Sequence, residues 1–239
     1  QSLPAVGNNM RPAVSSQVFD NKGRLITTLH SDQNRLPIDI NKVPQNLQNA
    51  FIAAEDNRFY DHIGIDPIGI VRAVITNVTN RGIAQGGSTI TQQLAKNAFL
   101  SQEQTLKRKI QEAMLALEIE RKYSKKEILE MYMNQIYFGQ GAYGIQTAAQ
   151  TYFGKDVTEL NLTQCAMLAG LPKSPNYYSP LTNLNEGIAR RNVVLSQMVK
   201  YGYISESEAT KAKDADLELV KKKSTVANNE TAAFIDYVS

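Results

Sequence analysis

Apolar side chains recur at helical spacing along most of this chain, and this periodicity limits what the chain can fold into. Between Leu47 and Ala54 the apolar residues stand at positions i, i+3, i+4 and i+7, which places them on one face of an α-helix. Further along, Ser124 and Glu127 have the Ser-x-x-Glu spacing of a helix capping box. We therefore predict a mainly α domain.

The two ends of the chain differ from its middle. Residues 1–16 are polar and punctuated by Gly and Pro, as in a linker. Two short apolar runs at 17–19 and 24–29 then flank a turn sequence, which predicts a small β segment, a hairpin, near the N-terminus. After residue 220 the chain becomes charged and polar again. We divide the chain into an N-terminal linker and β segment (1–42), a central domain (43–220) and a C-terminal linker (221–239).

Composition excludes several classes of protein. The chain has 239 residues, 42% of them hydrophobic, which suits one domain of roughly 150–200 residues with appendages. The single cysteine, Cys165, cannot form an intramolecular disulfide or a Cys-rich zinc site. The net charge of +3 is well short of a typical nucleic-acid-binding surface. No apolar run reaches the ~18 residues that span a bilayer.

Glu55 and Asp56 form an acidic pair where the helix that contains Phe51 is expected to end. Acids at the edge of a buried face lose hydration, and this end of a helix prefers cations. These conditions suit a carboxylate that acts as a general base. The other interpretation is a solvated helix end in which Asp56 caps the following turn. The two residues alone leave both interpretations open.

Gly86 and Gly87 lead into a segment, Ser88 to Gln93, that is rich in hydroxyl and amide groups. Ser88 is suited to cap a helix that continues through Lys96, and the free N–H groups at a helix start favour phosphate or pyrophosphate. The segment lacks the Gly-Lys-Ser/Thr ending of a Walker loop. Taken by itself, the pattern is more typical of an ordinary loop and helix cap.

A basic run, Lys107 to Lys109, precedes Glu112 by one helical turn. At spacings of three and four residues, Arg108, Lys109 and Glu112 share one helix surface. The usual interpretation is a solvated face with weak salt bridges. The functional interpretation is a cationic wall for an anionic group, with a carboxylate among the cations.

The stretch from Ile68 to Val78 is more apolar than a surface helix needs. Packing in the core is the default interpretation, and contact with a membrane surface or a lipid tail is the alternative. Four features are thus combined in this chain: an acidic pair, a helix start suited to pyrophosphate, a basic run and an apolar stretch. A lipid-pyrophosphate substrate would need this combination.

The chain resembles the peptidoglycan glycosyltransferase domain of class A penicillin-binding proteins and their monofunctional relatives, glycosyltransferase family 51. Five motifs carry the resemblance, in the family's order and over about residues 43 to 203: Glu55–Gly64, Gly86–Asn97, Arg108–Glu112, Lys125–Asn134 and Arg190–Leu195. Met133 stands where the family often has Leu. The chain has no Ser-x-x-Lys followed by Lys-Thr-Gly, so residues 221–239 are expected to lead toward a missing transpeptidase domain.

The resemblance implies a lysozyme-like fold of two lobes, a large head and a smaller jaw near the membrane. It also implies polymerisation of lipid II, a disaccharide-pentapeptide on undecaprenyl pyrophosphate, into β-1,4-linked glycan with inversion at the donor carbon. Glu55 is then the base that deprotonates the acceptor 4-hydroxyl, and Glu112 lies on the donor side. By the same resemblance, the substrate-binding residues are Asp56, Phe59 and His62, which orient Glu55; Ser88, Thr89, Gln92, Gln93 and Asn97, which position phosphate and sugar oxygens; and the cations Lys96, Arg108 and Lys109.

The implied partners are lipid II, the growing lipid-linked glycan and the membrane surface, with a site for a phosphoglycolipid inhibitor and no nucleic acid. The implied location is the extracytoplasmic face of the bacterial cytoplasmic membrane, with the N-terminal anchor absent from this chain. No cofactor is required and no metal ligands stand out, although Mg²⁺ or Mn²⁺ with the substrate pyrophosphate stays open. A lytic muramidase of lysozyme-like fold and a non-catalytic membrane-associated binding module are the rival hypotheses.

Overall fold

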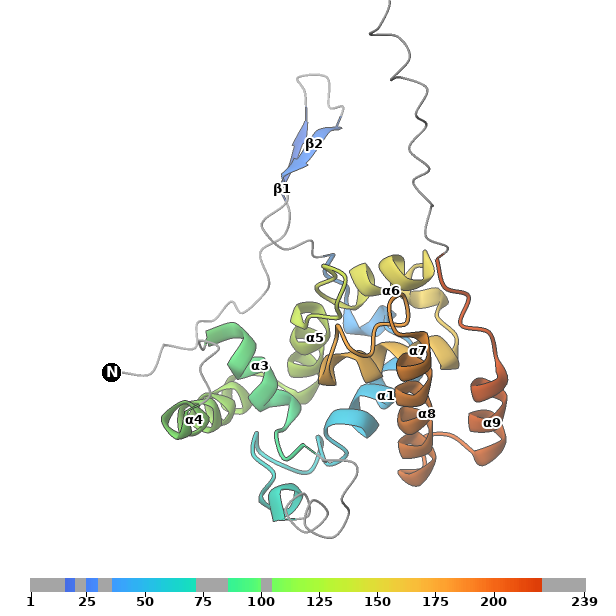
Figure 1. The fold of residues 1–239 in the computed structure, drawn as a ribbon. Coiled ribbons are helices and arrows are strands. Elements are labelled where there is room, and N and C mark those ends of the chain that lie inside the picture. The colour runs from blue at the N-terminus through green and yellow to red at the C-terminus, as the bar shows by residue number, and fades with distance from the viewer. Residues whose placement is uncertain (1–15, 20–24, 30–35, 72–85, 100–104, 221–239) are drawn as a thin grey trace, which may run out of the picture.

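The computed structural model describes residues 16–19, 25–29, 36–71, 86–99 and 105–220, and this part of the chain is almost entirely helical (Figure 1). The predicted mainly α fold class is therefore confirmed. No helix in these ranges is both long and apolar enough to cross a membrane. The α-helices are α1 (Gln45–Glu55), α3 (Ile90–Phe99), α4 (Leu106–Lys122), α5 (Lys125–Gln135), α6 (Ile145–Phe153), α7 (Leu162–Gly170), α8 (Leu184–Lys200) and α9 (Glu206–Asp214). Short 3-10 helices lie at η1 (Ile40–Lys42), η2 (Val157–Glu159) and η3 (Leu171–Lys173).

Two short strands precede the helices. β1 (Ser16–Phe19) and β2 (Leu25–Leu29) pair in antiparallel fashion, with a register irregularity between Val18 and Phe19. They coincide with the two apolar runs from which the hairpin is predicted.

The larger group of helices is built around α7. Residues 163–170 of this helix are all buried, and α7 packs against both α1 and α8 (Figure 1). A helix that is apolar on all sides needs neighbours around it. The packing of α7 fixes the C-terminal end of α1 relative to α8. These two helices form two walls of the cavity described below.

A smaller group lies beside the first. α3 packs along α4 and also touches α5, and Figure 1 shows this group to one side of α1, α7 and α8. Ser124 and Glu127 form the predicted capping box at the start of α5. The arrangement fits a larger and a smaller lobe, with α5 in contact with both α3 and α6.

The segment before α1 is held on α5 by side chains of the fourth motif. The Asn134 amide accepts from the Ile38 N–H and donates to the Ile38 carbonyl, both at 2.9 Å. The Ile40 N–H donates to Glu130 Oε2 at 2.8 Å. These backbone groups find their partners in side chains of α5, which helps to fix the segment on that helix.

The loop after α1 approaches α4 closely at Gly64. This residue has a φ of 103°, and a Cβ added to it would lie 2.8 Å from the carbonyl oxygen of Ala116. Both the conformation and the contact require glycine. The end of the first motif is therefore packed directly on the backbone of α4.

Cys165 should be inert in the folded protein. It lies on α7 and is fully buried, and burial raises the pKa of its thiol to about 12. The thiolate is the reactive form, so a thiol-reactive dye should not label the native protein at about pH 8 but should label it after unfolding in denaturant. Rapid labelling of the native protein would contradict the buried position of this helix.

Candidate active site

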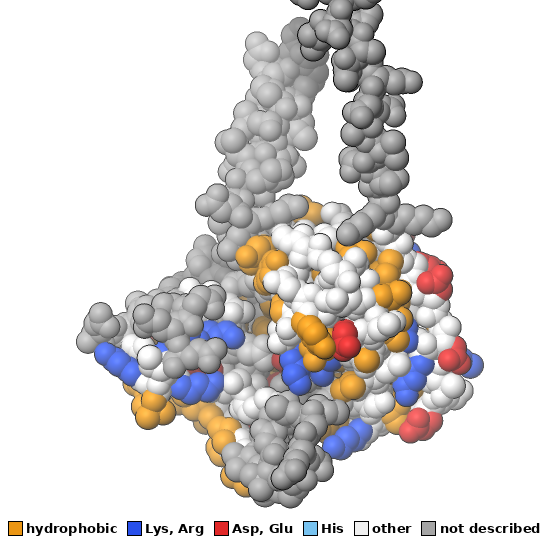
Figure 2. Space-filling model, in the orientation of Figure 1, with side chains coloured by type: hydrophobic (Ala, Val, Ile, Leu, Met, Phe, Trp, Pro, Cys, Tyr) orange, Lys and Arg blue, Asp and Glu red, His pale blue; other side chains and the backbone are white. Residues whose placement is uncertain are grey.

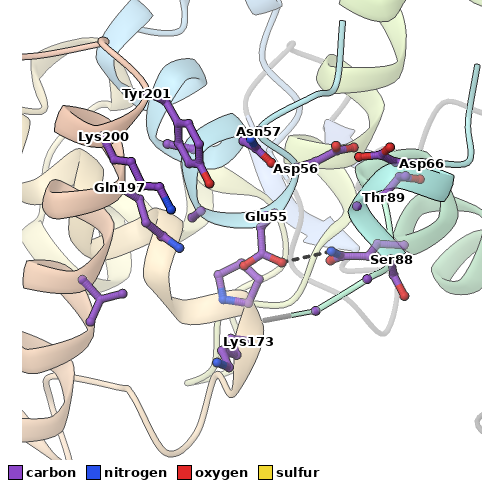
Figure 3. A pocket seen from close by; sticks show the side chains of 18 of the residues that line it. Glu55, Asp56, Asn57, Asp66, Ser88, Thr89, Lys173, Gln197, Lys200 and Tyr201 are labelled. Atoms are coloured by element: carbon purple, nitrogen blue, oxygen red, sulfur yellow. Dashed lines mark hydrogen bonds between the residues drawn. The ribbon is translucent and has the colours of Figure 1, made fainter. Parts of the chain in front are cut away.

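A cavity of about 960 Å³ lies where α1 ends, α3 begins and α8 passes, with η3 on another side (Figure 3). A space of this size accommodates a large ligand. The cavity brings together residues from the first, second and fifth motifs, which are far apart in the sequence. The predicted site residues that line it are Glu55, Asp56, Ser88, Thr89, Gln93 and Lys96.

Glu55 is the last residue of α1, and its side chain faces the cavity with 12% of its surface exposed. Its Oε2 accepts a hydrogen bond from Gln93 Nε2 at 3.0 Å. The guanidinium of Arg190 lies 3.6 Å from Oε1. The carboxylate therefore has a fixed orientation and a balancing charge, and it keeps access to the cavity.

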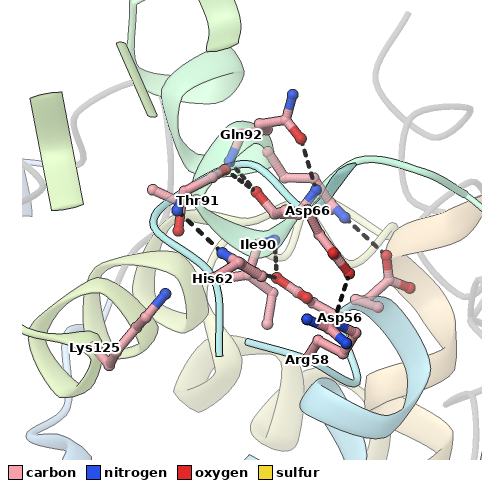
Figure 4. Close-up of polar contacts among 12 residues, drawn as sticks. Asp56, Arg58, His62, Asp66, Ile90, Thr91, Gln92 and Lys125 are labelled. Atoms are coloured by element: carbon pink, nitrogen blue, oxygen red, sulfur yellow. Dashed lines mark hydrogen bonds and ion pairs between the residues drawn. The ribbon is translucent and has the colours of Figure 1, made fainter. Parts of the chain in front are cut away.

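Asp56 belongs to a buried network of polar contacts that joins two motifs (Figure 4). Its Oδ2 accepts from the Ile90 N–H at 2.9 Å and lies 2.8 Å from His62 Nε2. His62 Nδ1 accepts from the Gly64 N–H at 3.0 Å, so a neutral ring donates from Nε2. Asp56 and His62 hold the start of α3 next to the end of α1.

Thr89, rather than Ser88, caps α3. Its Oγ1 accepts from the Gln92 N–H and its own N–H donates to Gln92 Oε1, each at 3.0 Å. The Thr89 hydroxyl also donates to the Gly64 carbonyl at 2.6 Å. The prediction of Ser88 as the cap is wrong by one residue, because only Thr89 stands where both bonds form.

Ser88 instead contacts a side chain of α4. Lys109 Nζ donates to Ser88 Oγ at 2.7 Å and forms an ion pair with Glu112. Glu112 is only 3% exposed, whereas the Lys109 side chain is half exposed. The predicted cluster of cation and carboxylate therefore exists, and Ser88 connects it to the cavity.

Seven predicted residues do not line the cavity. Phe59 is buried beneath the Lys125 ammonium group, which lies 4.6 Å from the ring centroid. Gln92 is buried in the cap of α3, and Asn97 is exposed on the same helix. The substrate-binding or catalytic roles of these seven residues therefore stay predictions. The full set is Phe59, His62, Gln92, Asn97, Arg108, Lys109 and Glu112.

The sequence did not identify the wall of the cavity opposite α3. Arg190 belongs to the fifth motif, which predicts no role for it, and Lys173 follows Pro172 in η3. Burial and the charge of Arg190 lower the pKa of Lys173, and Glu55 opposes that shift. On α8, Gln197 and Lys200 also line the cavity (Figure 3). The sequence did hold one signal for Lys173: a lysine that closely follows a buried apolar helix lies at the edge of the core, where it can face a cavity.

Within the described ranges, no group of three or more His, Cys, Asp or Glu side chains could hold a metal ion. Asp56 is already engaged by a backbone N–H and a histidine. The described acids therefore do not form a metal site of their own.

Comparison with known proteins decides the family. Residues 22–199 match the family described as Transglycosylase. The chain belongs to this family. The resemblance drawn from the five motifs is thus confirmed.

Relatives in the family come from several bacteria. The chain is 48% identical over 234 residues to Penicillin-binding protein 1A of Aquifex aeolicus, covering 98% of this chain and 31% of that protein. It is 47% identical over 208 residues to Penicillin-binding protein 1A of Escherichia coli, covering 86% and 24%. A crystal structure of Penicillin-Binding Protein 1A from Haemophilus influenzae is similar at a TM-score of 0.49 and 29% identity, over 87% of this chain and 21% of that one. The chain spans less than a third of the length of these relatives.

Asp56→Ala should destabilise the fold. The change leaves the Ile90 N–H and the His62 ring N–H buried without an acceptor, which costs about 3 kcal/mol of the free energy of unfolding. Denaturant unfolding measures this loss. Asp61→Ala, at an exposed acid of the same loop, is the matched control and should change stability by less than about 0.5 kcal/mol. Equal effects of the two changes would show that Asp56 does not join α1 to α3.

Proposed function

We propose that this domain polymerises lipid II by inverting glycosyl transfer, with Glu55 as the general base. The setting of Glu55 carries the proposal. Its carboxylate faces a large cavity, is held by Gln93 and Arg190, and shares that cavity with the cations Lys96 and Lys173. The transglycosylase family match supports the reaction class.

In the proposed reaction, Glu55 accepts the proton of the acceptor 4-hydroxyl while that oxygen attacks the anomeric carbon of the donor. The bond between this carbon and the pyrophosphate oxygen breaks on the opposite face, and its electron pair leaves with undecaprenyl pyrophosphate. Attack from the face opposite the leaving group inverts the configuration. The product is a β-1,4 link and a chain longer by one disaccharide.

The departing pyrophosphate gains negative charge, which fixed cations stabilise. Lys96 and Lys173 line the cavity, and Lys109 reaches it through Ser88. Arg108 precedes Lys109 on α4 and is assigned to the same task by the family motif. Glu112, paired with Lys109, keeps this lysine directed at Ser88 and so belongs to the donor side of the proposal.

Glu55→Gln should abolish chain lengthening. The amide cannot accept the proton, so turnover of labelled lipid II should fall by about 10²–10⁴-fold, with an unchanged melting temperature. Glu206→Gln, an exposed acid at the start of α9, is the control and should retain full turnover.

Three results of this experiment would contradict the proposal. Retained turnover in Glu55→Gln would exclude Glu55 as the base. Shortening of preformed glycan without synthesis would favour the lytic muramidase, which has no use for a pyrophosphate clamp. Binding of lipid II without any conversion by the wild-type domain would favour the non-catalytic module.

We further propose that the domain works at a membrane surface, where its substrate is anchored. Leu106, Ile110 and Met114 are 79%, 55% and 47% exposed, and their spacing of four residues puts them on one face of α4. Figure 2 shows apolar side chains gathered along the edge of the molecule that α4 forms. An exposed apolar row of this kind marks a contact surface, and a lipid surface is the contact that suits a membrane-anchored substrate.

The apolar stretch from Ile68 to Val78 extends this proposal only in part. Ile68 and Val71 are exposed, at 54% and 60%, whereas residues 72–78 lie outside the described ranges. The phosphoglycolipid inhibitor site belongs to the same proposal, because such an inhibitor resembles a lipid-linked pyrophosphate, and the extracytoplasmic location stays a prediction from the family.

Replacing Leu106 and Ile110 together with Ser should weaken the sedimentation of the domain with anionic liposomes. Because both side chains are exposed, the melting temperature should change little. Leu184→Ser, at an exposed leucine on α8 (46%), should leave liposome binding unchanged. A large fall in melting temperature with unaltered liposome binding would instead make the α4 row part of a packed interface.

A further inference from the structure

Tyr132 connects the fourth motif to the site without lining the cavity. It lies on α5, is fully buried, and its hydroxyl donates to Gln93 Oε1 at 3.2 Å. The other end of the same amide donates to Glu55 Oε2 at 3.0 Å. A chain of two hydrogen bonds therefore runs from the core of the protein to the proposed base.

The hydroxyl of Tyr132 is a neutral group that has a proton to donate. Burial raises its pKa well above the ordinary tyrosine value, and the nearby charges of Glu55 and Asp56 raise it further. Among the described residues, Gln93 is the hydrogen-bond partner of this hydroxyl. A buried donor without an acceptor is costly, so the proton must meet an acceptor on Gln93.

This requirement selects one orientation of the Gln93 amide. With Oε1 toward Tyr132, the Nε2 group necessarily faces the Glu55 carboxylate. A flipped amide would place Oε1 against Glu55 Oε2, two acceptors in contact, and would leave the Tyr132 proton unpartnered. Both losses oppose the flip.

We propose that Tyr132 is a positioning residue for the transfer reaction: its hydroxyl holds the Gln93 amide so that Nε2 donates to the carboxylate of Glu55. The inference rests on the proposed role of Glu55 as the base. It gives the fourth motif, whose residues do not line the cavity, a part in the chemistry through Gln93.

Losing the Tyr132 hydroxyl changes what Gln93 offers to Glu55. A free amide can turn its carbonyl to the carboxyl group, and that arrangement favours a protonated acid, which cannot act as a base. The other charged groups that pair with Glu55 or share its cavity are Arg190 and Lys200 on α8, Lys173 in η3, Lys96 on α3, Asp66, and Asp56, the next residue. Since none of them changes in a Tyr132 variant, a shift in the pH profile reports on the amide.

The test is Tyr132→Phe, assayed with labelled lipid II across a pH series. We expect kcat to fall about ten-fold, the equivalent of about 1.4 kcal/mol, while KM changes by less than about two-fold, because Tyr132 does not touch the substrate. The acid limb of the kcat profile should move to higher pH by about half a unit to one unit.

Tyr152→Phe is the matched control. Tyr152 is also fully buried, and its hydroxyl donates to the Phe138 carbonyl at 2.7 Å, away from the cavity. This variant loses that bond and a longer one to Ser179 Oγ at 3.4 Å, so its stability should fall at least as much while its pH profile stays that of the wild type. A shift of the acid limb in both variants would mean that the effect is only structural.

Gln93→Met provides a second, independent measurement. It should lower kcat at least as much as Tyr132→Phe does, and the double variant should be no worse than Gln93→Met, because Tyr132 acts through the amide. Two results would overturn the inference: additive losses of kcat in the double variant, or a Tyr132→Phe enzyme with wild-type kcat and pH profile.

Should Tyr132→Phe fail to fold, an unshifted acid limb in the kcat profile of Gln93→Met would overturn the inference equally. Failure of this inference can be told apart from failure of the proposed function. If the wild-type domain lengthens chains and Glu55→Gln does not, the role of Glu55 stands whatever the Tyr132 variant does.

Discussion

The arrangement of the site depends on one buried oxygen atom, Oδ2 of Asp56. It accepts from the first N–H of α3 and from the His62 ring, while Asp56 itself directly follows α1. Three pieces of chain meet at this atom: the end of a helix, the loop after it and the start of another helix. Because Glu55 precedes Asp56 and Gln93 lies in the first turn of α3, the same contact fixes the distance between the carboxylate and its hydrogen-bond donor.

Much of this arrangement follows from local sequence. Helical periodicity and capping spacing predict α1, α5 and the helical class, since these signals depend on neighbours within a few residues. The same reasoning places the first and second motifs at helix ends. It fails at the choice between Ser88 and Thr89, because both hydroxyls can cap a helix. The decision comes from Gly64, whose carbonyl, distant in sequence, accepts the Thr89 hydroxyl.

The wall formed by α8 could not be read from the sequence for a different reason. Arg190 reaches Glu55 because α1, α7 and α8 all pack on one another, and Arg190 Nε donates to the Gly170 carbonyl at the end of α7. The neighbouring Arg191 is also buried, but it binds Thr163 and the Lys213 carbonyl instead. Adjacent arginines of one motif thus have unrelated roles, and only tertiary packing separates them.

Gly64 limits how this protein can vary over evolutionary time. Any other side chain at this position would need a backbone conformation that L-residues rarely adopt and would collide with the carbonyl of Ala116. A lineage could therefore replace this glycine only if α4 moved away in the same step, and α4 carries both Lys109 and Glu112. Although Gly64 has no reactive group, a substitution at this position would therefore also displace the charged side chains of Lys109 and Glu112.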